Sequence, residues 1–431
     1  MANKKVFIET WGCQLNYHRS EKIAGTLSDN EYNVVDNPGE ADLIIFNTCA
    51  VRGKSEEKVL GRIGQIKSER KEDSVLGVGG CMAQHLGPDL FKISDGVDFI
   101  FGTSNISEIL ELSDKATRED NIHSVPDPGG FEELPALRNQ DHFAWVTIAE
   151  GCSNACSYCI VPQVRGPLRS RPPKQIFEEI EHLVQDNYKE IQLLGQNVNA
   201  FGQDIDEEDM DFAWLLKKVA EMGVPRISFT TPHPGDLKVK TLTVMRKHPN
   251  IVRHIHLPLQ SGSNRILQIM NRDYTREEYL EKIEQARSID PQVNITTDII
   301  VGHPGETEKD FQKTLDVMKR VKFGSIYVAQ FSPRPDTLSA SMEDNVPEEE
   351  KKKRLQLVLD RQKKYSKTVE PVFNGRSAEV LVEGMAREDG KVYGKNEFGK
   401  TVTFDGNKSM IGQFERVKYP APEGKTCKVD I

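Results

Sequence analysis

The sequence predicts an α/β protein in three parts: an N-terminal parallel α/β domain, a central partial (β/α) barrel and a small C-terminal β-barrel. Strand-length apolar runs alternate with helical stretches in the first third of the chain, a rhythm typical of a parallel sheet. The same alternation resumes further on, and five short alternating segments with Gly and Asn turns follow it. We therefore expect domains at 1–140, 141–367 and 368–431.

Composition limits the cellular setting. The chain has 431 residues, of which 29% are charged and 37% hydrophobic, and its apolar runs are only strand-length. We therefore expect no signal peptide and no membrane span. Seven cysteines in a long chain without an export signal favour metal binding or catalysis over disulfides. The expected location is the cytoplasm, and we expect a monomer.

The net charge of −9 argues against a nucleic-acid partner, but its distribution does not. From Pro347 to the end there are 18 Lys and Arg against 14 Asp and Glu, a local +4 that leaves −13 on the rest of the chain. This tail could grip a polyanion locally.

Three strands of the N-terminal domain each precede a cysteine. The strands are expected at 6–10, 42–47 and 74–79, with helices at about 20–27 and 54–70, and Cys13, Cys49 and Cys81 follow the strands in turn. The ligand crevice of a parallel sheet lies at the carboxyl ends of its strands, so the three thiols should converge. One such cysteine would usually be structural, but packing gives no reason for three at equivalent positions. We expect this N-terminal cysteine set (Cys13, Cys49 and Cys81) to hold an iron–sulfur cluster with one open iron.

A second set of three cysteines lies on the cysteine loop (residues 150–159), just past the strand expected at 143–148. Cys152, Cys156 and Cys159 are spaced C-x-x-x-C-x-x-C. A zinc site is the alternative, but zinc favours C-x-x-C pairs and four closed ligands. Three thiols would leave one iron of a cubane cluster open, and an open iron can chelate S-adenosylmethionine and pass an electron into its sulfonium. With Tyr158 before the last cysteine, the loop resembles the radical S-adenosylmethionine signature.

Barrel strands are expected at 190–194, 226–230, 255–257, 295–301 and 325–328, and polar clusters follow the first four of them, at the carboxyl ends where chemistry is expected. We expect cofactor contacts from side chains there and beside the cysteine loop. The candidates are Tyr158, Gln196, Asn197, His233, Gln260, Ser261 and Asp298. His233 could instead be structural in its Pro-flanked turn, and Gly302, Pro304 and Gly305 either shape a loop or allow close approach of adenine. No residue stands out as a catalytic acid or base.

Three blocks identify a resemblance. Residues 9–16 (ETWGCQLN), 47–52 (NTCAVR) and 80–84 (GCMAQ) resemble the methylthiotransferase N-terminal domain. Residues 195–199 (GQNVN) and 256–263 (HLPLQSGS), with 270–274 (MNRDY), are similar to the MiaB-type tRNA methylthiotransferases. Trp11, Gly53 and His303 depart from that pattern as Tyr, an acidic residue and Phe are usual there, which leaves substrate contacts near Trp11 and His303 open.

The resemblance implies a transferase with two [4Fe-4S] clusters. One molecule of S-adenosylmethionine would supply a radical at the cysteine loop and another the methyl group, while the N-terminal cysteine set would present sulfur. The implied target is carbon 2 of isopentenyladenosine 37 in tRNA, recognised in the anticodon stem-loop, with an electron donor such as flavodoxin or ferredoxin. Alternatives are a methylthiotransferase for a ribosomal-protein aspartate, one for threonylcarbamoyl-adenosine in tRNA, and a non-catalytic iron–sulfur RNA-binding protein.

The C-terminal part combines a charged helix, expected from 348 to 367, with short strands at 377–382, 391–394, 401–404, 414–419 and 426–431. The basic run at 351–354 is usually a solvated helix face. The strands resemble the TRAM domain, an RNA-binding barrel, whose basic side chains could position a stem-loop through phosphate contacts. Cys427 has no partner motif and is expected to be structural.

Overall fold

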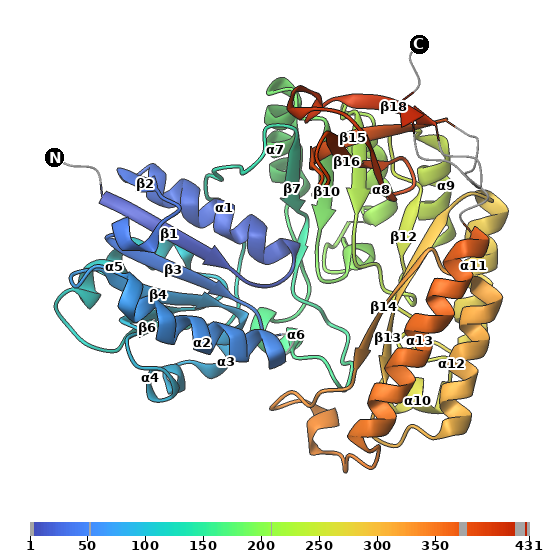
Figure 1. The fold of residues 1–431 in the computed structure, drawn as a ribbon, viewed down its shortest axis with the longest axis horizontal. Coiled ribbons are helices and arrows are strands. Elements are labelled where there is room, and N and C mark those ends of the chain that lie inside the picture. The colour runs from blue at the N-terminus through green and yellow to red at the C-terminus, as the bar shows by residue number, and fades with distance from the viewer. Residues whose placement is uncertain (1–3, 51–52, 208, 370–376, 419–426, 429–431) are drawn as a thin grey trace.

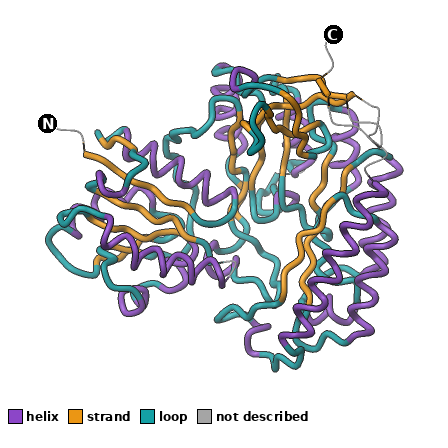
Figure 2. Tube along the Cα trace, in the orientation of Figure 1, coloured by secondary structure: helices purple, strands orange, loops and turns teal. Residues whose placement is uncertain are grey.

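The computed structural model describes residues 4–50, 53–207, 209–369, 377–418 and 427–428, and its secondary structure divides into three parts (Figure 1). The N-terminal part is a parallel sheet covered by helices, the central part is a partial barrel, and the C-terminal part is a small antiparallel sheet (Figure 2). The predicted fold class is confirmed. The predicted domain limit at residue 367 falls inside the last long helix, α13 (Glu348–Val369). No helix within the described ranges is long and apolar enough to cross a membrane.

The N-terminal sheet has six parallel strands in the order β2-β1-β3-β4-β5-β6. They are β1 (Lys4–Thr10), β2 (Tyr32–Val34), β3 (Leu43–Thr48), β4 (Val75–Gly80), β5 (Phe99–Phe101) and β6 (Ile122–Ser124). Helices α1 (Gln14–Ser28) and α5 (Ile109–Ala116) cover one face, and α2 (Gly53–Glu69) and α3 (Cys81–Leu86) the other, with α4 (Asp89–Ile93) beside them. The strand order reverses between β1 and β3, and such a switch point is where open α/β sheets bind ligands.

Helix α1 begins at Gln14, well before the expected start at residue 20. Its first turns carry polar residues that look exposed in sequence but are buried against the central part: His18 is 1% and Arg19 8% exposed. Their partners, Thr147 and Glu150, are remote in sequence, so local patterning could not reveal the helix start.

The barrel of the central part is built from two three-stranded parallel sheets, β7-β10-β11 and β12-β13-β14, and a short antiparallel pair, β8 (Ala149–Glu150) and β9 (Arg169–Ser170), lies apart from them. The barrel strands are β7 (Phe143–Thr147), β10 (Glu190–Leu194), β11 (Arg226–Phe229), β12 (His254–His256), β13 (Asn294–Val301) and β14 (Ser325–Gln330). A parallel bridge between Ile227 and Ile251 joins the two sheets into one partial barrel. The long helices around it are α7 (Pro173–Gln185), α8 (Phe212–Ala220), α9 (Val239–Lys247), α11 (Arg276–Ile289), α12 (Glu308–Val321) and α13.

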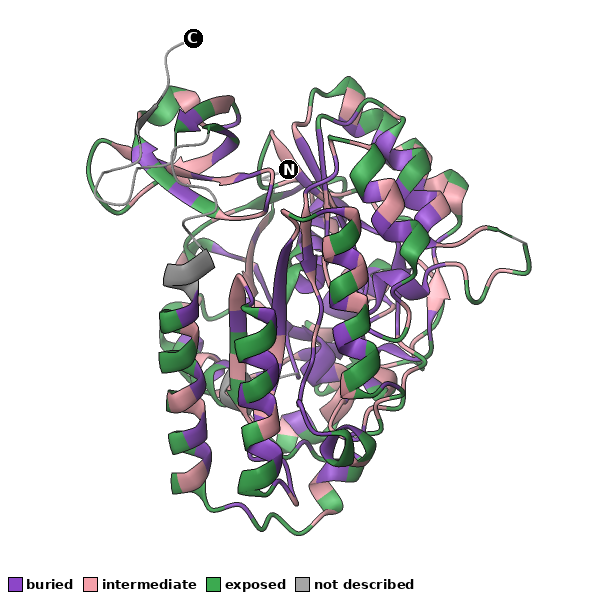
Figure 3. Ribbon diagram, turned by 90° about the vertical axis from the view of Figure 1, so that its right-hand side faces the viewer, coloured by how far each residue is buried: buried purple, intermediate pink, exposed green. Residues whose placement is uncertain are grey.

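Successive side chains of the barrel strands have opposite environments, as the period of a strand requires. Ile191, Ile227 and Ile255 belong to the large core under the helices, whose outer faces are exposed in stripes (Figure 3). The alternate positions are polar: Gln192 bonds to Trp145 and Ser228, and His256 bonds to Asp298. The barrel interior is therefore lined with hydrogen-bonding groups.

The C-terminal part is a five-stranded antiparallel sheet in the order β17-β16-β15-β18-β19, a half-barrel. Its strands are β15 (Ser377–Met385), β16 (Lys391–Asn396), β17 (Thr401–Asp405), β18 (Phe414–Lys418) and β19 (Cys427–Lys428). It docks on the first residues of the barrel strands: Arg226 donates to the Lys395 and Glu379 carbonyls, and Asn294 to the Phe398 carbonyl. The half-barrel thus covers the amino ends, opposite the cysteines. The side chain of Cys427 lies outside the described residues, so its structural role stays a prediction.

Candidate iron–sulfur active site

The cysteine loop leaves the carboxyl end of the barrel through β8 (Ala149–Glu150) and ends at the short helix α6 (Val161–Arg165). Gly151 has a φ of 75°, and a Cβ built on it would lie 1.9 Å from the Pro167 carbonyl oxygen, so only glycine fits the tight entry to the loop. Backbone bonds from Cys152 to the Gly166 carbonyl and from Ser157 to the Met270 carbonyl fix the loop on both sides. Three thiols of intermediate exposure result, held by backbone rather than by one another.

Arg272 binds the cysteine loop from the following segment. Its Nη1 donates to the Cys156 sulfur at 3.2 Å, and its Nε donates to the Tyr274 hydroxyl at 3.1 Å. The Tyr274 hydroxyl in turn donates to the carbonyls that follow β12 (His254–His256). Burial would lower the pKa of Arg272, but Tyr158, Tyr274 and Cys156 raise it further, so the guanidinium stays charged beside the loop.

Burial raises the pKa of the Cys152 thiol, and it raises that of Cys159 to about 12. Buried thiols of this kind stay neutral until a cation displaces their protons, and bound iron does so outright. Iron ions, which bind the deprotonated thiols, and the Arg272 guanidinium, which offsets the negative charge of the thiolates, therefore suit this loop.

The N-terminal cysteine set lies at the carboxyl ends of three neighbouring strands. Cys13 caps α1 after β1, Cys49 follows β3 directly, and Cys81 begins α3 after β4. A Cβ built on Gly12 would lie 2.9 Å from the Cys49 Cβ, which brings the first two loops together. Cys13 is exposed, whereas Cys49 and Cys81 are buried.

Asn16 ties two of the three strand ends to one another and also bonds to Arg165. Its amide Nδ2 donates to the Trp11 and Thr48 carbonyls, both at 2.9 Å, and so joins the loop before Cys13 to the residue before Cys49. Its Oδ1 accepts from Arg165 Nη2 at 2.9 Å.

Arg165 brings the central part to the same place. It is the last residue of α6, is 2% exposed, and its Nε donates to the Cys81 sulfur at 3.3 Å. Burial would lower its pKa, but Cys81, Glu150 and Cys13 raise it further, so Arg165 remains a cation. The N-terminal set and the cysteine loop, which ends just before α6, therefore meet at one interface between the first two parts.

No group of three His, Cys, Asp or Glu side chains in the described ranges is placed to hold a single metal ion. A cubane cluster does not need such a group, because each of its thiolates binds a different iron. In both sets of three thiols an arginine donates to a sulfur, and this chemistry fits an iron–sulfur cluster better than zinc, which favours four closed ligands.

The candidate cofactor residues gather at the carboxyl ends of the barrel strands. His233 is 7% exposed, and its Nδ1 accepts from the Gly235 backbone. Burial, and then Arg272, lower its pKa to about 4, so the ring is neutral and carries its proton on Nε2, which has no hydrogen-bond partner among the described residues. Gln196 likewise has a buried, unpartnered Oε1 within the part of the chain that the structure describes. Neither atom has its hydrogen-bonding capacity used within the described residues, although Asp273 Oδ1 lies 3.9 Å from His233 Nε2.

The side chains of Asn197 and Ser261 already form hydrogen bonds within the protein. The Asn197 side chain donates to Asp236 at 2.6 Å and accepts from the His233 backbone, and the Ser261 hydroxyl accepts from the Ser263 backbone at 3.3 Å. They shape the loops on which His233 and Gln260 lie, and their direct contact with a cofactor stays a prediction.

The three remaining candidates, Gln260, Asp298 and Tyr158, have different surroundings. Gln260 has a φ of 64° and bonds through its backbone to β13, leaving its buried Oε1 without a partner in the described ranges. Asp298 accepts from His256 at 3.1 Å and is otherwise open to the barrel interior. Burial raises the pKa of Tyr158, opposed by Arg272, and its ring lies beside the cysteine sulfurs.

Several residues were not singled out from the sequence. Asn199 is 4% exposed, and neither polar atom of its side chain has a partner in the residues described. Asn16, Arg165 and Arg272 join the cysteines as set out above. Asn199 could have been predicted as a candidate, because it is the last residue of the block 195–199. The contacts of the two arginines could not be predicted, because they depend on the packing of segments distant in sequence.

Trp11 and His303, two of the three departures from the family pattern, lie in separate places. Trp11 packs edge-on against Phe46, with ring centroids 4.9 Å apart, just before Cys13. His303 is fully buried and bonds to Ser339 at 2.9 Å, and Ser339 bonds to Ser157 of the cysteine loop. His303 therefore stabilises the cysteine loop through Ser339.

The basic run of α13 is a solvated face only in part: Lys352 and Lys353 are exposed, as expected, but the other two residues are buried. Lys351 is 1% exposed and pairs with Asp344 and Glu348, and Arg354 is 5% exposed and pairs with Glu306. These charges anchor the helix on the barrel, because the residues that neutralise them lie outside the run itself.

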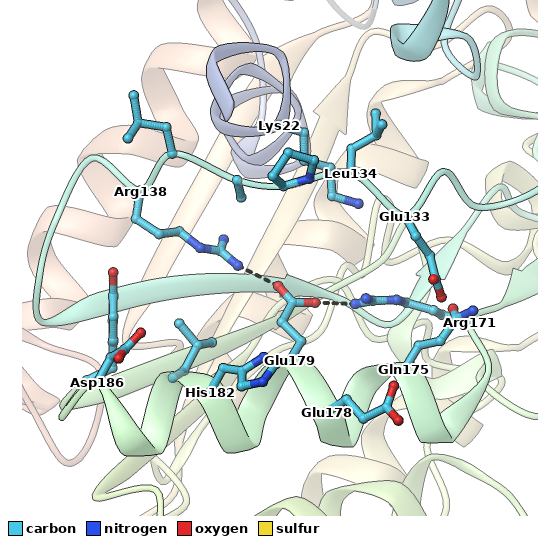
Figure 4. Close-up of a pocket in the computed structure, with 15 residues that line it drawn as sticks. Lys22, Glu133, Leu134, Arg138, Arg171, Gln175, Glu178, Glu179, His182 and Asp186 are labelled. Carbon is cyan, nitrogen blue, oxygen red and sulfur yellow. Dashed lines mark hydrogen bonds and ion pairs between the residues drawn. The ribbon is translucent and has the colours of Figure 1, made fainter. Parts of the chain in front are cut away.

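A separate cleft of about 630 Å³ lies between α1, the segment 133–138 and α7 (Figure 4). Glu179 stands at its centre and pairs with both Arg138 and Arg171. None of the six cysteines lines it, and its arginines are already neutralised, so we do not place the active site there.

Comparison with known proteins agrees with this architecture. Residues 5–102 match the uncharacterized protein family UPF0004, and residues 146–318 match the radical SAM superfamily, which implies a [4Fe-4S] cluster and S-adenosylmethionine. A radical S-adenosylmethionine methyltransferase, TsrM from Kitasatospora setae, shares the fold with a TM-score of 0.59 at 12% identity, over 79% of this chain and 77% of that one. The cobalamin-dependent radical enzyme OxsB aligns over 85% of this chain and 56% of its own, with a TM-score of 0.52 at 11% identity.

Closer relatives are known by sequence. A protein of Thermoanaerobacter sp. (strain X514) is 43% identical over 98% of this chain and 92% of its own, and one of Aquifex aeolicus (strain VF5) is 40% identical over 96% of each. Both are named tRNA-2-methylthio-N(6)-dimethylallyladenosine synthase. The chain belongs to the MiaB-type tRNA methylthiotransferases, a family of radical S-adenosylmethionine enzymes.

Proposed function

We propose that this enzyme is a tRNA-2-methylthio-N(6)-dimethylallyladenosine synthase, which places a methylthio group on carbon 2 of isopentenyladenosine 37. The observation that carries the proposal is the meeting of two separate three-cysteine sets at one interface, bridged by Arg165, which follows one set in sequence and contacts the other. The names of the relatives supply the substrate class.

We assign Cys152, Cys156 and Cys159 to the first cluster. With S-adenosylmethionine bound, this group supplies a 5′-deoxyadenosyl radical, which can remove hydrogen from a C–H bond that no side-chain base could deprotonate at neutral pH. The chain positions the cofactor: Arg272 holds the Cys156 thiolate, and the unpartnered groups of Gln196, His233, Gln260 and Asn199 among the described residues are the candidate contacts to its polar parts.

We assign Cys13, Cys49 and Cys81 to the second cluster, which would supply the sulfur. Asn16 joins the ends of β1 and β3, and Arg165 connects Asn16 to Cys81 and closes the interface to the barrel. A second molecule of S-adenosylmethionine would provide the methyl group. An electron donor such as flavodoxin or ferredoxin would reduce the clusters. We expect the enzyme to be cytoplasmic and monomeric.

The half-barrel is the proposed grip on the stem of the anticodon stem-loop. It lies at the amino ends of the barrel strands, so phosphate contacts there would act at a distance from the cysteines, while a splayed loop base enters the central site.

The test is a reaction with anaerobically reconstituted, dithionite-reduced enzyme, S-adenosylmethionine and an isopentenylated anticodon stem-loop, followed by nuclease digestion and nucleoside mass spectrometry. We expect a nucleoside heavier by one methylthio group. Formation of 5′-deoxyadenosine with unchanged RNA would refute the substrate, and a mass increase on a ribosomal protein instead would select the protein-modifying alternative. Absence of 5′-deoxyadenosine would favour a non-catalytic RNA-binding protein.

A further inference from the structure

Arg165 carries more contacts to the N-terminal cysteine set than its place in the sequence suggests. It lies six residues after Cys159, yet its Nε donates to the Cys81 sulfur at 3.3 Å and its Nη2 to Asn16 at 2.9 Å. The side chain is 2% exposed, so both bonds are made in a dry environment, where such contacts are strong.

The third nitrogen of the guanidinium is left over. Nη1 is buried and has no hydrogen-bond partner within the described residues. A buried N–H without an acceptor costs about 1–3 kcal/mol, and more on a charged group, so an acceptor is expected to complete this site.

The nearby carboxylate does not fill that role. Glu150 accepts two bonds from Arg19, at 3.2 and 3.0 Å, and no bond from Arg165 to Glu150 is present among the described side chains. Among the described side chains, the sulfur that Arg165 contacts is that of Cys81, which belongs to the N-terminal cysteine set.

We propose that Arg165 is a positioning residue of the second cluster: its Nε holds the Cys81 thiolate, and its Nη1 donates to an anionic sulfur ligand on the iron that the three cysteines leave open. The inference rests on the proposed function for the presence of that iron. Because Arg165 is delivered by the helix that ends the cysteine loop, it also couples the placement of the sulfur to the domain that makes the radical.

Removing this donor should shift the midpoint potential of the second cluster in a defined direction, which a purely structural role of Arg165 does not predict. A cation and an N–H to sulfur both stabilise the reduced, more negative cluster, so their loss shifts the midpoint potential to more negative values. Lysine keeps the charge but not the fork of donors, so Arg165→Lys should recover part of the shift.

The experiment uses the full chain with Cys152, Cys156 and Cys159 changed to Ala, so that only the second cluster is measured. Iron content and an EPR-monitored potentiometric titration are compared for this parent and its Arg165→Met, Arg165→Lys and Arg171→Met derivatives. Arg171 is the matched control, since it is a buried arginine of the same interface that pairs with Glu179 and touches no cysteine.

We expect a more negative potential in Arg165→Met, an intermediate value in Arg165→Lys and no change in Arg171→Met. Iron loss in Arg165→Met that Arg165→Lys restores would also support the proposal. An unchanged potential in Arg165→Met at full iron content, or equal iron loss in all three derivatives, would overturn it. A parent that binds no iron would instead refute the second cluster itself, which is a failure of the proposed function rather than of the role of Arg165.

Discussion

The two cysteine sets are assembled from the chain in opposite ways. The cysteine loop gathers three thiols within eight residues of one loop, while the N-terminal set takes one thiol from each of three strands of a sheet. Each set receives one arginine on one sulfur, Arg272 on Cys156 and Arg165 on Cys81. The first arginine comes from the barrel that carries its own loop, and the second crosses from another part of the molecule.

That difference predicts different sensitivities. The cysteine loop depends on its own backbone geometry, whereas the N-terminal set depends on the registration of β1, β3 and β4 and on the interface with the barrel. Changes remote from Cys13, Cys49 and Cys81 should therefore damage the second cluster more readily than the first.

The largest expected effect separates the two sets by their products. Cys156→Ala should reduce 5′-deoxyadenosine formation to the level of a control without enzyme, because the loop loses a cluster ligand. Cys49→Ala should keep 5′-deoxyadenosine formation but give no methylthio nucleoside. Chromatography of both products from one reaction measures this, and loss of 5′-deoxyadenosine in Cys49→Ala would show that the sets are not independent.

Arg272 tests the arginine of the cysteine loop. Arg272→Met should lower 5′-deoxyadenosine formation roughly 10–100-fold, the usual effect of losing a partner of a metal ligand. Arg276→Met is the control, because Arg276 pairs with Asp316 on the outer helices and touches no cysteine. Equal rates of 5′-deoxyadenosine formation in the two variants would show that Arg272 has no specific role at the cysteine loop.

Asn16 tests the dispersed set. Asn16→Ala leaves the buried Thr48 carbonyl without its amide donor, which should weaken the local structure by about 1–3 kcal/mol. Hydrogen exchange of α1 and iron analysis measure the result, with iron lost from the N-terminal set alone. In Asn30→Ala, which loses only a part-buried bond from an exposed side chain to the Thr26 carbonyl, we expect less than about 0.5 kcal/mol. Equal iron loss from both sets would contradict the separation drawn above.

The smallest expected effect concerns the half-barrel, which neither set touches. Burial, and then His256 and Lys395, lower the pKa of His254 to about 4. The unfolded chain binds this proton more readily, so the contribution of neutral His254 is present above about pH 6.5 and is lost as the pH falls below it. Between pH 8 and pH 6 the loss should be about 1 kcal/mol.

Hydrogen exchange of residues 377–418 at the two pH values measures that loss, because the half-barrel packs its Gly399 on His254. His254→Gln should show less pH dependence than the parent. The same pH dependence in both would assign the effect to another group.

The comparison also explains what sequence could predict. The cysteine loop was recognisable because its ligands are neighbours in the chain, and the N-terminal set because each cysteine follows a strand of a parallel sheet. The fold class followed from the alternation of strands and helices. Arg165 and Arg272 could not be assigned, since each contacts a thiol more than eighty residues away. The start of α1 was misjudged for the same reason, because its polar groups are satisfied by remote partners. Lys351 is buried although its partners, Asp344 and Glu348, are close to it in sequence.

The most direct test of the central claim is the iron and sulfide content of anaerobically reconstituted protein, with each cysteine set changed to Ala in turn. Two [4Fe-4S] clusters predict about eight irons per chain in the parent and about four in either triple variant, with Mössbauer spectra that add up to that of the parent. A parent with only about four irons, or a Cys13, Cys49 and Cys81 variant that keeps the full content, would contradict the assignment of two clusters.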